Sequence, residues 1–418
     1  MVSYQKTQLS NGLTVIVHED HSTPLAAVNV LYKVGSKNEK PDKTGFAHLF
    51  EHLMFEGSAN IPNYDTPLYQ AGGENNAFTS TDLTNYYCTL PANNVETAFW
   101  LESDRMLSLN FNEDSLKLQK SVVIEEFKET CFNQPYGDVW HKIQDLSYKE
   151  HPYKWPVIGK SIAHIEQATL ADVKDFFFTY YRPNNAILTV TGDVQSATIF
   201  QLAEKWFGEI PSGANTDHSI AEEQVQRSFR HLSVQADVPV DAIYLAFHIC
   251  KRTHKDYHAT DMLNDLLASG SSSRLHQQLV KNKSLFTHIT ATMLGGMDKS
   301  LFFVYGKLAK GVSMTNAEKA IWMELNYLKK HPVDTYEIGK LKNKTESDII
   351  FSEISLRSRA FYLAYFEALG DLREINNEVN KYLKVTPRDI QHIAQTIFQK
   401  ANCSTLYYYA KMGQQQNK

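Results

Sequence analysis

The segment Gly45–Gly57 contains two histidines and a glutamate in the order His-x-x-Glu-His, at His48, Glu51 and His52. In a helix, residues four apart project from the same face, so both imidazoles could reach one metal ion. Glu51 follows His48 by three positions, where its carboxylate could hold and deprotonate a water molecule on the open side of that metal. The pattern therefore indicates metal-assisted hydrolysis, and the alternative is a pair of surface histidines beside an ordinary acid.

A catalytic zinc ion usually takes three protein ligands and one water molecule, so a third ligand is needed. Glu125, Glu126 and Glu129 lie on a predicted helix with apolar periodicity and offer three carboxylates. Their side chains point in different directions around that helix, so spacing alone does not choose among them, and at least one belongs to an ordinary solvated acidic turn. The large apolar residues around the two histidines favour a bound metal, because buried imidazoles and a buried carboxylate are costly without a compensating partner.

Strands and helices must position these residues, and the hydrophobic pattern predicts elements of both kinds. The predicted strands and helices do not alternate strictly along the chain. The predicted strands are residues 13–17, 26–32, 76–90 and 186–191, and the predicted helices are 44–55, 95–106, 115–130 and 170–181. This mixture predicts an α+β fold.

The second half of the chain repeats features of the first half. Thr169 and Thr386 each open a predicted helix, and Asn185 and Asn402 each precede a predicted strand, with both pairs separated by 217 positions. A duplication explains these spacings better than a coincidence between two common helix starts. The sequence therefore predicts two homologous α+β domains, at residues 1–210 and 231–418, joined by a linker at 211–230 whose first part is rich in turn-forming residues.

Composition excludes several classes of protein. The 418 residues include 42 Lys and Arg against 47 Asp and Glu, a formal net charge of −5, which argues against a nucleic-acid-binding protein. No run approaches the ~18 apolar residues of a membrane span, and the start of the sequence does not read as a secretory signal. We therefore expect a cytoplasmic protein, or a periplasmic one if a leader precedes this sequence. Four cysteines without CxxC spacing are expected to be free thiols: Cys88, Cys131, Cys250 and Cys403.

Several longer motifs resemble those of the insulinase, pitrilysin and mitochondrial processing peptidase family. They are GFAHLFEHLMFEGS, NNAFTSTDLTNYYCTLP, KSVVIEEFKE, RPNNAILTVTGD and LLASGSSSRLHQQL, and the similarity is greatest to the half-size bacterial members. The inverted His-x-x-Glu-His order is the inverzincin signature. The resemblance implies two homologous α/β-sandwich domains with the metallohydrolase fold of LuxS and the processing peptidases. It also implies one zinc ion per chain, held by His48, His52 and Glu126, with Glu51 as the catalytic base.

The resemblance also covers a segment expected to bind the substrate. Asn76, Ala77 and Phe78 match a family segment that aligns the substrate along an edge strand, where Asn76 could hold a substrate carbonyl; the alternative for Asn76 is a turn residue. Three positions depart from the family pattern. Gln119 replaces a glutamate near the metal, while Val280 and Thr287 replace an arginine and a tyrosine that contact the substrate. We therefore expect a dimer in which a related, zinc-free chain supplies the missing pair.

The expected function is a zinc metalloendopeptidase that hydrolyses peptides or unfolded segments in a chamber closed by two half-size chains. One alternative is a non-catalytic scaffold of the same fold, and another is a maturation protease dedicated to one small peptide precursor. Other candidate sites are weaker, because His254 and His258 lack a placed acid and Ser269–Arg274 lacks the phosphate-loop pattern.

Overall fold

The computed structural model describes residues 2–214 and 220–411, so the predicted linker at 211–230 lies partly outside the described residues. The chain divides into two compact units. Unit 1 comprises Met1–Lys128, Trp155–Ile220 and Asp348–Glu378, and unit 2 comprises Glu129–Lys154, Ala221–Ser347 and Val379–Lys418. The domains predicted from the sequence are continuous, whereas each compact unit also takes a helical segment from the other half of the chain.

Unit 1 contains a six-stranded sheet with the order β1-β2-β6-β3-β5-β4. The strands are β1 (Gln5–Gln8), β2 (Thr14–Glu19), β3 (Leu25–Tyr32), β4 (Glu74–Thr79), β5 (Thr84–Pro91) and β6 (Ala186–Gly192). β2 and β6 are parallel, and the other neighbours are antiparallel. β4 therefore forms one edge of the sheet.

The single strand predicted at residues 76–90 is wrong, since β4 and β5 form a hairpin there. The turn is stabilised by Ser80, whose backbone N–H donates to the Leu83 carbonyl at 2.8 Å and whose hydroxyl accepts from the backbone N–H groups of Asp82 and Leu83. A serine hydroxyl that bonds nearby backbone in this way competes with an extended conformation.

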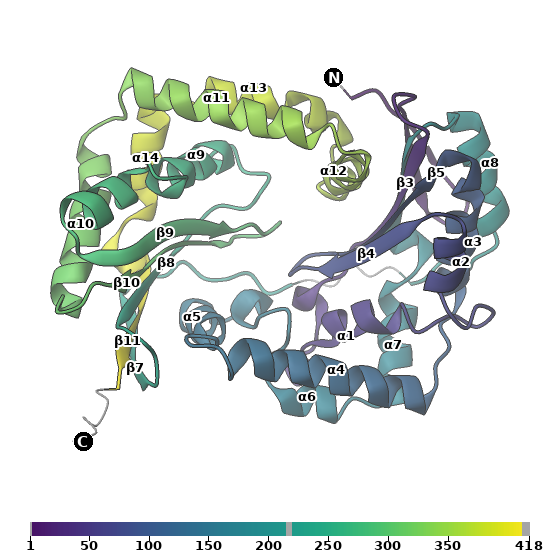
Figure 1. The fold of residues 1–418 in the computed structure, drawn as a ribbon, viewed down its shortest axis with the longest axis horizontal. Coiled ribbons are helices and arrows are strands. Elements are labelled where there is room, and N and C mark those ends of the chain that lie inside the picture. The colour runs from purple at the N-terminus through teal and green to yellow at the C-terminus, as the bar shows by residue number, and fades with distance from the viewer. Residues whose placement is uncertain (1, 215–219, 412–418) are drawn as a thin grey trace. The chain divides into compact units, whose positions relative to one another are not determined.

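Helices cover both faces of this sheet. In Figure 1, α3 and α8 lie on one side of β3 and β5, and α12 lies on the other side. The helices of unit 1 are α1 (Phe46–Leu53), α2 (Asp65–Gln70), α3 (Val95–Leu107), α6 (Ile162–Glu166), α7 (Leu170–Tyr180), α8 (Ser196–Phe207) and α12 (Leu356–Ala368), with most of α4 (Glu113–Cys131). Short 3₁₀ turns lie at Ser36–Asn38, Ala92–Asn94, Pro183–Asn185 and Leu372–Asn377. The core between the sheet and α1, α3 and α7 includes Val28, Tyr86, Phe50, Phe99 and Phe177.

Unit 2 contains a five-stranded sheet with the order β7-β11-β8-β10-β9. Its strands are β7 (Arg230–Ala236), β8 (Ala242–His248), β9 (Phe286–Leu294), β10 (Leu301–Leu308) and β11 (Cys403–Ala410). Its helices are α5 (Val139–Ser147), α9 (Tyr257–Ala268), α10 (Met314–Lys330), most of α11 (Thr335–Ser352), α13 (Glu378–Lys384) and α14 (Pro387–Ile397), with a π-helix at His276–Asn282 and 3₁₀ turns at Pro152–Lys154 and Lys400–Asn402. α5 packs on the sheet through Val139 and Ile143, in a cluster with Tyr244, Phe303 and Tyr408.

The two units are copies of one arrangement. The strands β2, β6, β3, β5 and β4 have the same order as β7, β11, β8, β10 and β9. β3 and β8 begin 217 positions apart, as do β5 and β10, β6 and β11, α7 and α14, and α5 and α12. Thr169 with Asp172 and Thr386 with Asp389 form matching capping boxes at the starts of α7 and α14. The predicted α+β fold with two homologous domains is confirmed.

Within residues 2–214 and 220–411, no helix is both long enough and apolar enough to cross a membrane.

Candidate metal centre

Helix α1 presents the His-x-x-Glu-His residues on one side and packs the other side into the core. Phe46, Leu49, Phe50 and Leu53 are buried, whereas the residues of the motif are half-buried. The helix begins after Gly45, whose φ of +87° favours glycine. A Cβ atom there would also lie 2.9 Å from the carbonyl oxygen of Ile158, a backbone atom, so glycine is favoured at this entry to α1.

The buried carboxylate of Glu39 fixes the start of α1. Its two oxygens accept hydrogen bonds from the backbone N–H groups of Gly45 and Ala47, both at 2.9 Å. These N–H groups have no partner within the helix, and an acidic group suits that helix end. Burial raises the pKa of Glu39 to about 8, and the N–H donors oppose this shift. Sequence reasoning missed Glu39, because nothing in its local pattern distinguishes it from a surface acid.

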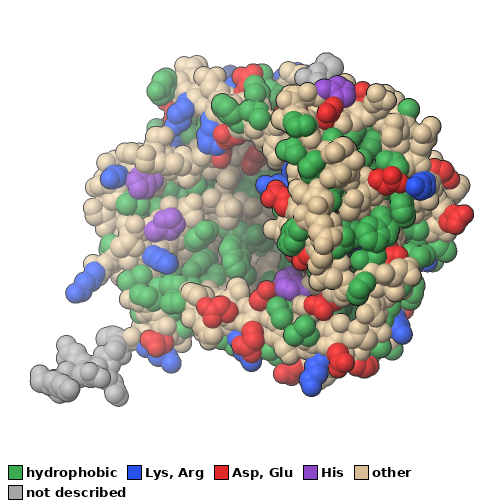
Figure 2. Space-filling view, turned by 45° about the vertical axis from the view of Figure 1, so that its right-hand side comes forward, with side chains coloured by type: hydrophobic (Ala, Val, Ile, Leu, Met, Phe, Trp, Pro, Cys, Tyr) green, Lys and Arg blue, Asp and Glu red, His purple; other side chains and the backbone are tan. Residues whose placement is uncertain are grey.

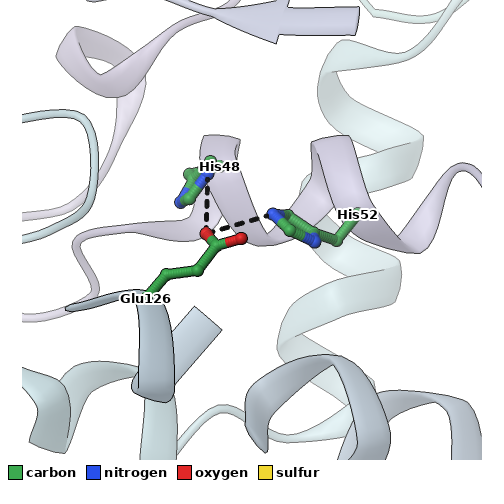
Figure 3. A group of neighbouring side chains, drawn as sticks. All are labelled: His48, His52 and Glu126. Carbon is green, nitrogen blue, oxygen red and sulfur yellow. Dashed lines mark ion pairs between the residues drawn. The ribbon is translucent and has the colours of Figure 1, made fainter. Parts of the chain in front are cut away.

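Three side chains with metal-ligand atoms meet in front of α1 (Figure 3). Oε2 of Glu126, on α4, lies 3.6 Å from Nε2 of His48 and 3.5 Å from Nε2 of His52. All three ligand atoms lie within 4.8 Å of one another, and this is the one such group of three that the described residues contain. The two distances exceed those of good hydrogen bonds, but they are near the ~3.3 Å between ligand atoms of a tetrahedral zinc site with bonds of about 2.0–2.1 Å.

The two neighbouring glutamates point elsewhere. Glu125 pairs with Lys128 at 2.7 Å. Glu129 accepts hydrogen bonds from Asn133 and Gln134. Of the three carboxylates that spacing left open, Glu126 is therefore the one that faces the two histidines.

The electrostatics of the group suit a divalent cation. Burial, with a smaller contribution from the neighbouring His52, lowers the pKa of His48 to about 4, so its ring is neutral at physiological pH. A neutral imidazole is the form that binds a metal. Nδ1 of His48 is also buried with no hydrogen-bond partner in the described structure. Two imidazole nitrogens and one carboxylate fit the ligand set of a catalytic zinc ion.

Glu51 is placed as an acid–base group beside these ligand atoms. Its Oε2 accepts a hydrogen bond of 2.6 Å from the hydroxyl of Thr79, at the end of β4. Burial raises the pKa of Glu51, and the hydrogen bond from Thr79 opposes this effect. A carboxylate with a raised pKa is better matched to accepting and returning a proton near neutral pH. The strand alternation, which gives Thr79 the same face as Ala77, could have identified Thr79 as a neighbour of this site.

Asn76, Ala77 and Phe78 lie on β4, whose one described partner is β5. Asn76 and Phe78 are exposed and Ala77 is half-buried. The backbone N–H of Ala77 donates to Oδ1 of Asn76 at 2.7 Å. Asn76 is therefore a strand residue rather than a turn residue, and no strand of the described residues pairs with the outer edge of β4.

The three positions that depart from the family pattern differ in their surroundings. Nε2 of Gln119 donates to Glu56, while its Oε1 is buried without a hydrogen-bond partner in the described structure. Val280 is half-buried in the π-helix of unit 2, and the exposed Thr287 donates to the Lys307 carbonyl at 3.2 Å. None of the three supplies a ligand to the metal group in the described part of the chain.

Other features do not form a competing site. His254 lies 3.6 Å from Asp256, and His258 is buried in α9 against the ring of Tyr382. The four cysteines are free thiols, as expected. Acidic and basic side chains are interspersed on the face of the molecule that Figure 2 shows, in keeping with the small net charge.

Two family descriptions match the chain. The family described as Insulinase (Peptidase family M16) matches residues 14–159, and the one described as Peptidase M16 inactive domain matches residues 167–345. The protein named Zinc protease PqqE, from Helicobacter pylori, is 31% identical over 413 residues, which cover 97% of this chain and 92% of that protein.

Solved structures agree with these matches. A crystal structure of a protease from Helicobacter pylori has a TM-score of 0.92 and 30% identity, and the match covers 98% of this chain and 100% of that one. The periplasmic protease PqqL from Escherichia coli has a TM-score of 0.77 and 16% identity, and the match covers 97% of this chain but 47% of that one. This chain therefore corresponds in fold to about half of that longer protein.

Proposed function

The chain belongs to the insulinase family, peptidase family M16, and on this premise we propose that it is a zinc-dependent metalloendopeptidase. The observation that carries the proposal is the position of Glu126, whose carboxylate lies 3.5–3.6 Å from Nε2 of both His48 and His52. Glu51 lies on the same helix as the two histidines and is free to act as a base rather than as a ligand. We assign His48, His52 and Glu126 as the ligands of one zinc ion and Glu51 as the catalytic base.

The proposed mechanism is hydrolysis of a peptide bond without a covalent intermediate. Zinc, when bound, supplies a Lewis acid that polarises the scissile carbonyl and makes an attacking water more acidic. Glu51 accepts a proton from that water while the water oxygen attacks the carbonyl carbon. The same carboxyl group then donates the proton to the leaving amine, which balances the reaction. Thr79 orients Glu51 through their 2.6 Å hydrogen bond.

The substrate in this proposal is a peptide or an unfolded segment that binds in extended form. The open edge of β4 can pair with an added strand through main-chain hydrogen bonds, which do not depend on the substrate sequence. The side chain of Asn76 is exposed at that edge and can bond a substrate carbonyl. The direct bond from Thr79 to Glu51 connects this strand to the proposed base, so a peptide paired with β4 passes beside it.

We propose further that two half-size chains close around the substrate. The basis is the match to about half of PqqL and the absence of an arginine and a tyrosine at Val280 and Thr287. Neither valine nor threonine can stabilise a developing oxyanion as those side chains can. A related zinc-free chain would supply the pair. Hydrolytic activity is measured for the isolated, monomeric chain and for its mixture with such a partner. Equal activity in the two samples would contradict this part of the proposal.

The test of the main proposal separates the metal from the base. We expect Glu51→Gln to retain one zinc ion per chain, measured by elemental analysis, and to lose about 10²–10⁴-fold in peptide hydrolysis, because the amide cannot accept the proton. Glu125→Gln, on the exposed side of α4, is the matched control and should retain both zinc and activity. Unchanged turnover in Glu51→Gln would overturn the mechanism. A wild-type chain that binds no zinc would instead support the scaffold alternative.

A further inference from the structure

An ion pair is buried on α3, within the core of unit 1. Arg105 and Glu102 are 2% and 1% exposed, and the guanidinium group of Arg105 donates two hydrogen bonds to the carboxylate of Glu102, at 2.8 Å from Nε and 2.5 Å from Nη2. The hydroxyl of Tyr64, which is also buried, donates to the same carboxylate at 2.7 Å. Apolar side chains of similar size would fill this space without the cost of removing two charges from water. The pair therefore needs an explanation other than core packing.

Three aromatic rings surround the guanidinium group. Its carbon Cζ lies 4.5 Å from the ring centroids of Tyr64 and Tyr86 and 5.6 Å from that of Phe55. The ring of Phe55 also contacts those of Tyr64 and Tyr86, with centroids 5.9 and 6.0 Å away. Nη1 of Arg105 is buried without a hydrogen-bond partner among the described residues, and the rings stabilise its charge instead. We refer to Arg105, Glu102, Phe55, Tyr64 and Tyr86 as the arginine cluster.

Phe55 connects the arginine cluster to the last turn of α1. Its backbone N–H donates to the carbonyl oxygen of His52 at 3.1 Å, so the position of the ring and that of the helix end are linked. The segment that follows is also held to α3. Asp104 accepts hydrogen bonds from the hydroxyl of Ser58, and from the backbone N–H and side-chain amide of Asn60 at 3.2 and 2.7 Å. α3 therefore holds the chain on the C-terminal side of His52.

Unit 2 lacks this arrangement on the matching helix. α3 follows β5, and α10 follows the matching strand β10. When the two helices are aligned at their first residues, Glu102 and Arg105 correspond to Ile321 and Glu324. Ile321 is fully buried, and Glu324 pairs with the exposed Lys283 at 2.7 Å. The unit that carries the His-x-x-Glu-His residues is thus also the unit that has a buried ion pair at these positions.

We propose that the arginine cluster positions the metal site. Arg105, paired with Glu102, fixes the last turn of α1 through Phe55. This contact sets the direction of the His52 side chain, whereas His48 lies one turn nearer the capped start of the helix. The inference rests on the proposed function, because it takes His52 as a zinc ligand. Groups that orient a ligand strongly affect the affinity for the metal, so loss of the cluster should weaken zinc binding in a chain that still folds.

The main test replaces the polar atoms of the cluster by apolar ones of similar size. Tyr64→Phe, Glu102→Leu and Arg105→Met are combined in the full-length chain, because removal of one charge alone would leave the other buried and unpaired. We expect the affinity for zinc, measured by competition with a chromogenic chelator, to fall about tenfold or more. The visible absorption bands of the Co²⁺-loaded chain should also change, since they report the geometry of the ligands around the metal. Urea unfolding of the metal-free chain shows whether the fold is retained.

Two single substitutions test the link between the ion pair and α1. Phe55→Leu leaves the pair in place but removes the ring that joins it to the helix, and it should lower the affinity for zinc about threefold to tenfold. Glu96→Gln is the matched control. Glu96 lies in the first turn of the same helix α3, where it pairs with the exposed Lys205 at 2.6 Å. This substitution should change neither the affinity nor the Co²⁺ spectrum.

The outcomes separate the positioning role from the peptidase activity. Wild-type zinc affinity and an unchanged Co²⁺ spectrum in the folded triple variant would overturn the positioning role, and so would the same result in Phe55→Leu. If the triple variant does not fold, Phe55→Leu decides the question. A wild-type chain that binds zinc but hydrolyses no peptide would contradict the proposed function, while weaker zinc binding in the variants would still support the positioning role. Peptide hydrolysis by the wild-type chain, with equal zinc affinity in every variant, would overturn the positioning role alone.

Discussion

Units 1 and 2 share a strand order but differ in the helix that follows the matching strands β3 and β8. In unit 1 this helix is α1, which carries His48, Glu51 and His52. In unit 2 it is α9, and when the two helices are aligned at their first residues, the corresponding positions are the buried Ala259, Met262 and Leu263. The fold therefore forms with or without the His-x-x-Glu-His residues on this helix. The candidate site is a small set of side chains placed on a scaffold that does not require them.

The largest expected effect comes from removing a ligand in unit 1. His52→Ala should lower zinc affinity by about a thousandfold or more, because a three-ligand site loses one of its nitrogen donors. Competition with a chromogenic chelator measures this change. His254→Ala, a half-exposed histidine of unit 2, is the control and should leave zinc affinity unaltered. Equal loss of zinc in both variants would contradict the expectation that the zinc-binding histidine lies in unit 1 and not in unit 2.

The corresponding position in unit 2 should affect stability without affecting the metal. Leu263 is fully buried in α9, so Leu263→Ala should reduce the free energy of unfolding by about 2–5 kcal/mol. Urea unfolding monitored by fluorescence measures this change, and zinc content is measured on the folded fraction. Loss of zinc from a folded Leu263→Ala chain would show that unit 2 takes part in metal binding.

A smaller effect is expected from the residue that orients Glu51. Thr79→Val keeps the shape and the strand propensity but removes the hydroxyl that donates to Glu51. We expect kcat for peptide hydrolysis to fall about tenfold, with zinc content and KM little changed. Thr89→Val, on the same hairpin but away from Glu51, is a matched control. A loss of zinc in Thr79→Val would assign Thr79 to the metal site instead.

The parts of this comparison that depend on local spacing could be predicted from the sequence. The helix with His48, Glu51 and His52 and the repeat of Thr169 and Thr386 follow from periodicity within single segments, and the structure contains both. The position of Glu126 was not settled by spacing, because it depends on how α4 is rotated toward α1. Only the resemblance to known proteins selected it over Glu125 and Glu129.

Other features depend on contacts between distant parts of the chain, which local patterns do not report. Phe361 reaches Phe78 from a position 283 residues later. Glu39 lies only six and eight positions before the N–H groups that it accepts from, but the irregular segment between them has no periodicity that predicts the contact. The hairpin at β4 and β5 was missed for a different reason. Residues 80–82 lack glycine and proline, and the turn instead depends on the hydroxyl of Ser80.

The long separation in sequence between α12 and the sheet that it covers affects how unit 1 folds during synthesis. α12 packs on β3 and β6, yet 176 residues separate Gly192, the end of β6, from Ala368, the end of α12. At ~5–20 residues per second, a ribosome needs roughly 9–35 s to synthesise that stretch. During this interval one face of the unit 1 sheet is not covered by α12. Helix α5 likewise lacks its packing partner β11, the last strand of unit 2, until that strand has been synthesised. A gene fragment that ends near residue 210 should therefore yield an incomplete and aggregation-prone product rather than an independent domain.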